Sequence, residues 1–265
     1  MESAARNSGL HVHVLMISTF LDLYDNSTCY LHQSFTNITF FTISLKDVFV
    51  ETPLEKIYQR NEFLQSYYKT IHLSDLLRVA LIYKVGGFYS DLDSVTLNNL
   101  RYMKNVVGST LKNSTTTFHH IPNGVFQFSK NHELLLHYMN NINSTFSGQV
   151  FNEIGPPLLT ETFKSFFNIS HVEHFFNVNA SVLPSHFFFP AKSYQVFDGK
   201  SEGLLWTRNM MSSDDWKQWL KYSYMIHFYS SQSSDIIVQD DINHEAYAYV
   251  APRYCPISYQ SSKNF

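Results

Sequence analysis

The chain has 265 residues and a net charge of −3, and 44% of its residues are hydrophobic while only 15% are charged. No run of 18 apolar residues occurs, which excludes a membrane-spanning helix within this sequence, and the many large apolar side chains exclude an intrinsically disordered chain. The small net charge gives no electrostatic footprint for nucleic acid, so we expect no nucleic-acid partner.

Strands and helices alternate along the chain. The predicted elements, in chain order, are strands at 12–17 and 38–43, a helix from Pro53 to about Arg60, a helix from Ser74 to Lys84, a strand at 88–93, a strand at 125–128 after an Asn123-Gly124 turn, helices from Asn131 to Asn140 and after Gly155-Pro156-Pro157, a helix opening at Asp214 and a strand at 224–228. This alternation predicts an α/β fold. No linker or internal repeat interrupts it, so we expect a single domain over residues 1–265.

The clearest helix is expected to begin at Ser74, a residue type that caps helix N-termini. Asp75 then falls in the first turn and Lys84 in the last, where each charge is favourable to the helix dipole. The helix is apolar over most of its circumference, which predicts burial. Gly86-Gly87 follows and ends it.

Two acids, Asp91 and Asp93, stand at the end of the next predicted strand. Alternate side chains of an extended segment point the same way, so we expect the two carboxylates to share a face. Paired hard oxygens suit Mg²⁺ or Mn²⁺ with a phosphate completing the shell. Two solvated turn carboxylates are the alternative, and the pair alone does not decide between them.

The predicted helix also carries a polar pair, Asp75 and Arg78, three residues apart and therefore neighbours on one face. Because the rest of the helix is apolar, this pair has to be satisfied internally or face a site. It either forms a buried structural ion pair or reaches a ligand held at Asp91 and Asp93.

The order of these motifs resembles a known family. Residues 73–93, with Asp75, Arg78, Gly86-Gly87 and Asp91-Leu92-Asp93, are similar to the donor-binding signature of DXD-type glycosyltransferases, in the group of lactosylceramide 4-alpha-galactosyltransferase and alpha-1,4-N-acetylglucosaminyltransferase. Further matches spread the resemblance over nearly the whole chain, at Glu2–Arg6, Asn123-Gly124, Gly155-Pro156 and Tyr254-Cys255-Pro256.

The resemblance implies a GT-A fold, which is a Rossmann-like α/β domain that binds a UDP-sugar through a divalent metal. It also implies a donor-binding part at about 71–100 and a C-terminal alpha-1,4-glycosyltransferase part at about 120–257. The first strand of the nucleotide-binding sheet precedes the Glu2–Arg6 segment in the family, so we expect this sequence to be N-terminally incomplete and to lack that strand.

Residue roles follow from the same resemblance. Asp91 and Asp93 are expected to hold Mn²⁺ or Mg²⁺, with Asp91 also contacting the ribose. Asp75 and Arg78 are expected to hold the donor sugar, so that Arg78 joins the two metal-binding acids in the catalytic set. The expected substrate-binding residues are Asp75, Arg78, Asp91, Asn123, Gly124, Gly155 and Pro156.

His227 stands where the family has a His-x-Trp-Asn-Lys-Lys segment. Its imidazole either completes the metal shell or is a satisfied core residue. The lysines are absent here, since the chain continues Phe-Tyr-Ser-Ser-Gln. Asn152 and Glu153, before the Gly155-Pro156 segment, either meet the acceptor or are solvated loop residues.

Six N-x-S/T sequons, at Asn26, Asn37, Asn113, Asn143, Asn168 and Asn179, hint at a lumenal protein, but residues 1–10 show no secretory signal. The resemblance implies a type II membrane protein of the Golgi apparatus with its catalytic part in the lumen. Its anchor and stem would precede Met1, so this sequence carries neither signal nor anchor.

The resemblance therefore implies a retaining alpha-1,4-glycosyltransferase. It would move galactose or an N-acetylhexosamine from a UDP-sugar to a lactosylceramide-like glycolipid acceptor in glycosphingolipid biosynthesis. A catalytically silent relative that binds a sugar nucleotide or glycan is the alternative, favoured by the altered segment after His227. Hydrolysis of the UDP-sugar is a third possibility, as a side activity.

Overall fold

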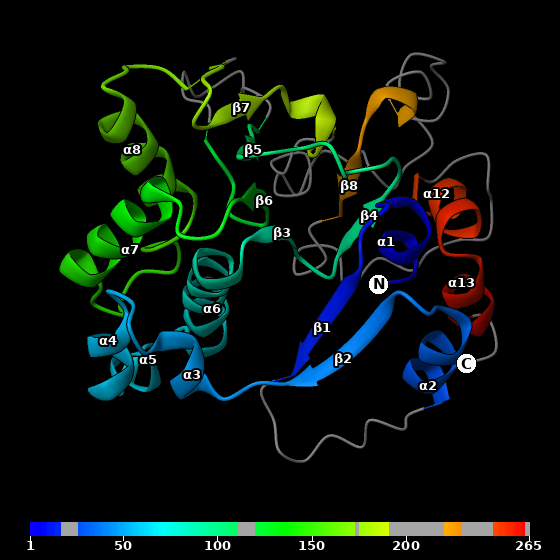
Figure 1. The fold of residues 1–265 in the computed structure, drawn as a ribbon, viewed down its shortest axis with the longest axis horizontal. Coiled ribbons are helices and arrows are strands. Elements are labelled where there is room, and N and C mark those ends of the chain that lie inside the picture. The colour runs from blue at the N-terminus through cyan, green and yellow to red at the C-terminus, as the bar shows by residue number, and fades with distance from the viewer. Residues whose placement is uncertain (17–25, 111–119, 173–174, 191–219, 229–245, 263–265) are drawn as a thin grey trace, which may run out of the picture.

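The computed structural model describes residues 1–16, 26–110, 120–172, 175–190, 220–228 and 246–262 (Figure 1). Its helices are α1 (Glu2–Asn7), α2 (Asn26–Ser34), α3 (Leu45–Phe49), α4 (Glu55–Gln59), α5 (Glu62–Gln65), α6 (Lys69–Val85), α7 (Glu133–Thr145), α8 (Pro156–Phe167), the 3₁₀ helix η1 (Ser185–Phe187), α12 (Ala246–Tyr254) and α13 (Pro256–Ser262). Its strands are β1 (Val12–Met16), β2 (Ile38–Thr42), β3 (Gly87–Ser90), β4 (Ser94–Thr96), β5 (Val106–Gly108), β6 (Val125–Phe128), β7 (Ser181–Leu183) and β8 (Met225–His227).

The described strands form three small sheets. β1 and β2 pair in parallel, and β4 pairs antiparallel with β8. The third sheet has the order β3-β6-β5-β7, in which β5 and β7 run parallel and the other neighbours run antiparallel. The α/β prediction is therefore confirmed, with mixed sheets.

The main core lies between the four-stranded sheet and three helices. α6 lies between α7 and β3, and α7 and α8 pack side by side on the flank away from α1, α12 and α13 (Figure 1). Buried apolar side chains from these three helices meet those of β5 and β6, among them Val79, Val107, Phe126, Tyr138 and Phe163. A second cluster joins β4 and β8 to α12. Among the described residues, no helix combines the length and hydropathy needed to cross a bilayer.

The long helix begins earlier than the sequence predicts. α6 starts at Lys69, so Ser74 is not its cap and Asp75 lies in its second turn. The start is set by Ser66, whose hydroxyl accepts a hydrogen bond from the Tyr68 amide at 2.8 Å and contacts His72 Nδ1 at 2.8 Å. Those contacts order the chain before Ser74, and the expected burial of the helix is confirmed.

α7 also differs from the prediction. Asn131 does not cap it, because Asn131 has a φ of 58° and lies outside the helix. The cap is His132, whose Nδ1 accepts a hydrogen bond from the Leu134 amide at 3.2 Å. The helix continues five residues past Asn140, to Thr145, because Tyr138, Met139 and Ile142 keep burying an apolar face. The predicted strands at 125–128 and 224–228 and the helix after Gly155 are confirmed. The helix predicted at Asp214 lies outside the described residues.

The first and last described helices are joined directly. The Glu2 carboxylate in α1 accepts hydrogen bonds from the backbone amides of Ile257 at 3.1 Å and Ser258 at 2.7 Å, in the first turn of α13. α1 is also fixed to β4, because Ser3 Oγ accepts from the Thr96 amide at 3.1 Å and Asn7 Nδ2 donates to the Thr96 carbonyl at 2.9 Å. β4 is thus held by α1 as well as by β8.

Candidate active site

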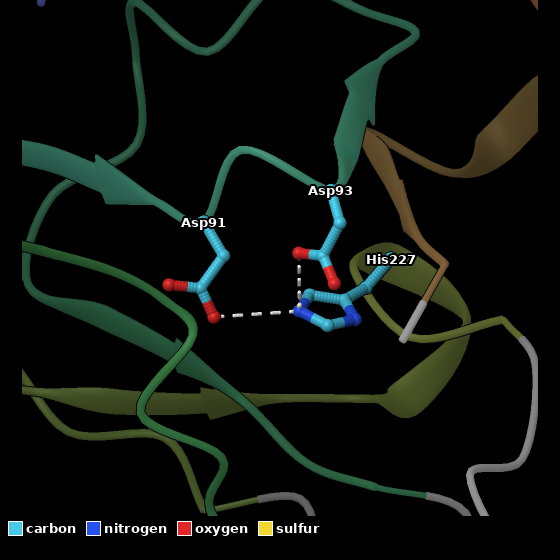
Figure 2. Close-up of side chains that lie close together, drawn as sticks. All are labelled: Asp91, Asp93 and His227. Carbon is cyan, nitrogen blue, oxygen red and sulfur yellow. Dashed lines mark hydrogen bonds and ion pairs between the residues drawn. The ribbon is translucent and has the colours of Figure 1, made fainter. Parts of the chain in front are cut away.

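Asp91 and Asp93 lie in the turn between β3 and β4, not on one strand. β3 ends at Ser90 and β4 begins at Ser94, and the two strands belong to different sheets, so the expected alternation along an extended segment is wrong. The turn nevertheless brings the carboxylates together, because both are directed at the imidazole of His227, which comes from β8 (Figure 2).

His227 joins the two acids. Its Nε2 lies 3.5 Å from Asp91 Oδ2 and 3.2 Å from Asp93 Oδ1. One ligand atom from each of the three residues can be chosen so that all lie within 4.8 Å of one another. His227 is buried while the two acids are only partly buried, so the group opens toward solvent on the carboxylate side. The two carboxylates suit Mn²⁺ or Mg²⁺, and an imidazole in the same shell favours Mn²⁺ of the two.

Gly124 makes room for this arrangement. A Cβ at position 124 would lie 2.6 Å from Asp91 Oδ2 and 3.3 Å from His227 Nε2. The Gly124 carbonyl also accepts a hydrogen bond from the Asp91 amide at 2.8 Å. The Asn123-Gly124 turn therefore supports the acids through its backbone and through the missing side chain.

Arg78 connects the helix to the acids. The turn at Gly86, with a φ of 72°, sends β3 back along α6, so that Asp91 returns to the level of Arg78. Arg78 Nη1 lies 3.2 Å from Asp91 Oδ1 and donates to the Asn123 carbonyl at 3.0 Å. Arg78 Nη2 lies 3.3 Å from Asp75 Oδ1. One guanidinium thus serves two carboxylates.

Further hydrogen bonds hold the side chains of Asp75 and Arg78, the ion pair on α6. Asn123 Nδ2 donates to Asp75 Oδ1 at 2.8 Å. Ser74, which sequence analysis took for a cap, instead accepts from Arg78 through its hydroxyl, at 2.8 Å from Nη2, and through its carbonyl. The Arg78 guanidinium also lies over the Tyr89 ring, 4.8 Å from its centroid. Arg78, Asp75 and Asn123 are all buried.

The two acids beside Arg78 titrate differently. Burial raises the pKa of Asp75 to about 6, although the Arg78 charge and the Asn123 hydrogen bond act in the opposite direction. Burial also opposes ionisation of Asp91, but the hydrogen bond from His227 and the charge of Arg78 outweigh it and hold the pKa of Asp91 below its ordinary value. Asp91 is therefore the ionised partner of Arg78, and Asp75 holds a proton nearer to neutral pH.

Three residues of the site were missed by sequence analysis. The Tyr89 hydroxyl donates to Asp91 Oδ1 at 2.7 Å, and burial raises the pKa of this phenol, which keeps it a donor. Ser74 is the second. The third is Ser94, which pairs across the β4–β8 ladder with His227 and whose buried hydroxyl has no hydrogen-bond partner among the described residues. Alternation along the 88–93 run could have placed Tyr89 beside Asp91; no sequence signal marks Ser94.

Gly155 and Pro156 stand at the start of α8 and reach this group only through intermediates. The hydroxyl of buried Tyr138 donates to the Ile154 carbonyl at 2.5 Å, and Tyr138 interacts electrostatically with Asp75 and Arg78. The Ile121 amide, two residues before Asn123, donates to Thr160 Oγ1 of α8 at 2.9 Å. Glu153 supports a loop, because its carboxylate accepts hydrogen bonds from the amides of Ser147 and Gly148, the latter at 2.8 Å. Asn152 is exposed beside it.

Two family models match the chain. A model described as the alpha 1,4-glycosyltransferase conserved region matches residues 127–262, and a model described as a glycosyltransferase sugar-binding region containing a DXD motif matches residues 13–115. The site draws Asp91 and Asp93 from the second region and His227 from the first. The mixed α/β architecture is consistent with the GT-A-like fold expected for such sequences.

Curated relatives are similar over most of the chain. Lactosylceramide 4-alpha-galactosyltransferase of Pongo pygmaeus is 28% identical over 87% of this chain and 100% of that sequence. The Homo sapiens protein of the same name is 27% identical over 87% of this chain and 62% of its own length. Alpha-1,4-N-acetylglucosaminyltransferase of Homo sapiens is 24% identical over 61% of this chain and 48% of that protein. The chain thus spans less than two thirds of these two human relatives.

Proposed function

Because the chain belongs to the alpha 1,4-glycosyltransferase family, a family of hexosyltransferases, we propose that it is a metal-dependent alpha-1,4-glycosyltransferase. It moves galactose or an N-acetylhexosamine from a UDP-sugar, with retention of anomeric configuration, to a lactosylceramide-like glycolipid in glycosphingolipid biosynthesis. The convergence of Asp91, Asp93 and His227 within 4.8 Å carries the proposal, because these three ligand atoms could hold the metal ion of a metal–diphosphate complex. The names of the relatives supply the acceptor and the linkage.

The metal-binding residues are Asp91, Asp93 and His227. Their donor atoms fit Mn²⁺ or Mg²⁺, and the space that Gly124 leaves beside Asp91 Oδ2 and His227 Nε2 keeps those atoms accessible to an ion. When bound, the ion supplies Lewis-acid stabilisation of the departing UDP diphosphate.

The protein's own residues orient the donor. Arg78 and Tyr89 both engage Asp91 Oδ1, so Asp91 is fixed as an ionised ligand with Oδ2 turned toward His227. Asp75 lies on the other side of the guanidinium, and its raised pKa lets a fraction of it donate a hydrogen bond to a sugar hydroxyl near neutral pH.

The other expected substrate residues keep proposed roles. Asn123 orients Asp75 through its side chain and Arg78 through its carbonyl. Gly124 shapes the metal site, and Gly155 with Pro156 forms the acceptor side at the start of α8. We place the catalysis in the Golgi lumen at a membrane; exposure of the sequon residues Asn168 and Asn179 supports that location.

The test is an assay of UDP release from UDP-galactose, UDP-N-acetylgalactosamine and UDP-N-acetylglucosamine, with Mn²⁺ or a chelator, and with or without a lactosyl acceptor. We expect release that needs both Mn²⁺ and the acceptor, and we expect Asp93→Ala to abolish it. Asp47→Ala, which removes an exposed acid on α3, is the matched control and should be fully active.

Each other outcome has a distinct meaning. Activity that survives Asp93→Ala contradicts the metal assignment. UDP release at the same rate with and without the acceptor indicates hydrolysis of the donor. UDP binding without any release indicates a silent sugar-nucleotide-binding protein.

A further inference from the structure

An exposed apolar cluster lies at the N-terminal end of α6. It combines side chains of α5, the start of α6 and the loop before α8, and we call it the α6 apolar cluster: Leu64, Tyr67, Tyr68, Ile71, Val150 and Phe151. Tyr67 is 76% exposed and Val150 is 60% exposed, so these side chains are not part of the core. Large apolar side chains gathered on a surface mark an interaction site, whereas scattered ones do not.

Hydrogen bonds between the start of α6 and the loop before α8 fix the backbone that carries the α6 apolar cluster. The Tyr67 amide donates to the Gly148 carbonyl at 3.0 Å, which ties the start of α6 to the loop. His72, one turn into α6, faces the carbonyls of Val150 and Phe151 with Nε2, at 3.1 and 3.3 Å. The rings of Tyr68 and Phe151 meet edge to face, with centroids 5.4 Å apart. The exposed side chains therefore project from a fixed base.

This cluster continues the helix stripe that carries the candidate site. Tyr68, His72, Asp75 and Arg78 follow at intervals of four, three and three residues, which is the spacing of one helix face. His72 is close enough to Asp75 to act on its pKa. Ile71 precedes Asp75 by four residues, about 6 Å along the helix axis. The exposed apolar surface thus begins about one turn from the donor-binding pair.

We propose that the α6 apolar cluster docks on the surface of a lipid bilayer and thereby presents the site to glycans that stand on that surface. Tyrosine and phenylalanine together with aliphatic side chains are the composition that inserts at the headgroup level. None of the six is charged, and Lys69, exposed between Tyr68 and Ile71, supplies a cation for lipid phosphates. This inference rests on the proposed function in one respect: a short glycan keeps its acceptor hydroxyl close to the membrane, so the site has to approach the membrane too.

The first test needs no activity. The whole chain is mixed with vesicles of dioleoylphosphatidylcholine, with and without dioleoylphosphatidylserine, and the bound fraction is measured by flotation. We expect binding, and we expect the double variant Tyr67→Ser/Val150→Ser to weaken it by about tenfold, since two exposed apolar side chains are lost. Tyr67→Trp should strengthen binding, because Trp is favoured at the membrane interface. Tyr102→Ser, at an exposed tyrosine between β4 and β5, is the control and should bind normally.

The second test compares two acceptors. On lactosylceramide in the same vesicles the double variant should turn over at least about tenfold more slowly than the parent chain, while on soluble methyl β-lactoside both should be equally active. If neither protein uses either acceptor, the proposed function fails, and the flotation result still decides on membrane docking.

Three results would overturn the inference. One is vesicle binding by the parent chain that Tyr67→Ser/Val150→Ser and Tyr67→Trp both leave unchanged. Another is equal loss on the soluble lactoside, which would make the cluster a sugar-binding surface. The last is a dimer in light scattering that the double variant converts to a monomer without any vesicle binding, which would make it an interface between two copies of the chain.

Discussion

Arg78 on α6 holds one oxygen of Asp91 in the turn after β3, with Nη1 of the guanidinium 3.2 Å from Oδ1 of the carboxylate. The same guanidinium lies 3.3 Å from Asp75, and all its nitrogens have partners in the protein. Asp75 and Arg78 therefore fit both interpretations of their pairing. They form a buried ion pair whose polar atoms have partners, and Arg78 also contacts Asp91, a proposed metal ligand.

Removing Arg78 should unfold the protein more readily. In Arg78→Met the buried carboxylate of Asp75 and the partly buried one of Asp91 both lose their cation, and the loss of one partner of a buried pair typically costs about 3–5 kcal/mol. Chemical denaturation at pH 7 measures the change. Arg60→Met, which breaks an exposed pair with Glu62, is the control and should cost less than about 1 kcal/mol. A similar small loss for Arg78→Met would contradict the role of this guanidinium.

The raised pKa of Asp75 makes stability depend on pH. The ordinary value is 3.8 and the folded value is about 6, so between these two the folded chain keeps a proton that the unfolded chain has lost. The free energy of unfolding should therefore fall as pH rises from about 4 to about 6, by about 2–3 kcal/mol. Urea titrations of the parent chain and of Asp75→Asn across this range isolate the effect, because the variant lacks that slope. Parallel curves for the two proteins would show that Asp75 does not titrate there.

Gly124→Ala should impair metal binding. The new Cβ would lie 2.6 Å from Asp91 Oδ2, so the carboxylate has to move away from His227. We expect Mn²⁺ affinity, measured by calorimetry, to fall by at least about tenfold, since misplaced ligands lose that much or more. Gly155→Ala is the matched control, because the nearest atom to its Cβ is 3.6 Å away. Equal Mn²⁺ affinities for the two variants would contradict the proposal that Gly124 makes room for the metal ligands.

Ser94→Ala should leave stability unchanged or raise it. Its buried hydroxyl has no partner among the described residues, so its removal relieves an unsatisfied polar group and should leave Tm unchanged or raise it. Ser109→Ala is the matched comparison and should lower Tm, because that hydroxyl donates to the Leu183 carbonyl at 3.1 Å. A Tm that falls equally in the two variants would show that the Ser94 hydroxyl has a partner in the folded protein.

The sequons should not be used equally in a secreted form of the chain. Asn37 Nδ2 already donates to the carbonyls of Ala5 at 2.9 Å and Leu10 at 3.2 Å, so a glycan there would break the contacts of this residue with α1 and with the segment between α1 and β1. Asn168 and Asn179 are exposed. Mass spectrometry before and after enzymatic deglycosylation should find glycans at these two and none at Asn37. Occupancy at Asn37 in the folded protein would mean that this contact is absent.

Most strands and the burial of α6 were predictable because they depend on local patterns of apolar residues and glycine. The start of α6 was not, because Ser66 and His72 fix it through contacts that residue types alone do not reveal. The convergence of Asp91 and Asp93 was predicted for the wrong reason, since a turn between two sheets creates it.

The family resemblance offered His227 as a metal ligand, with a buried core residue as the alternative. Residue patterns alone could not decide between them, because 136 residues separate His227 from Asp91 and the pairing of β8 with β4 brings them together. The departure from the family after His227, from Tyr229 on, lies outside the described residues.

The contact of Glu2 with α13 has a consequence for how the protein is made. α1 is synthesised well before α13, because the amides that its carboxylate binds lie 255 and 256 residues after Glu2. α1 also holds β4, the strand that follows Asp93 directly. We therefore expect a nascent chain to hold β4, and with it Asp93, in its final position only after α13 has been translated. A chain that stops before residue 257 would carry the metal-binding acids without the contacts that fix α1 to α13.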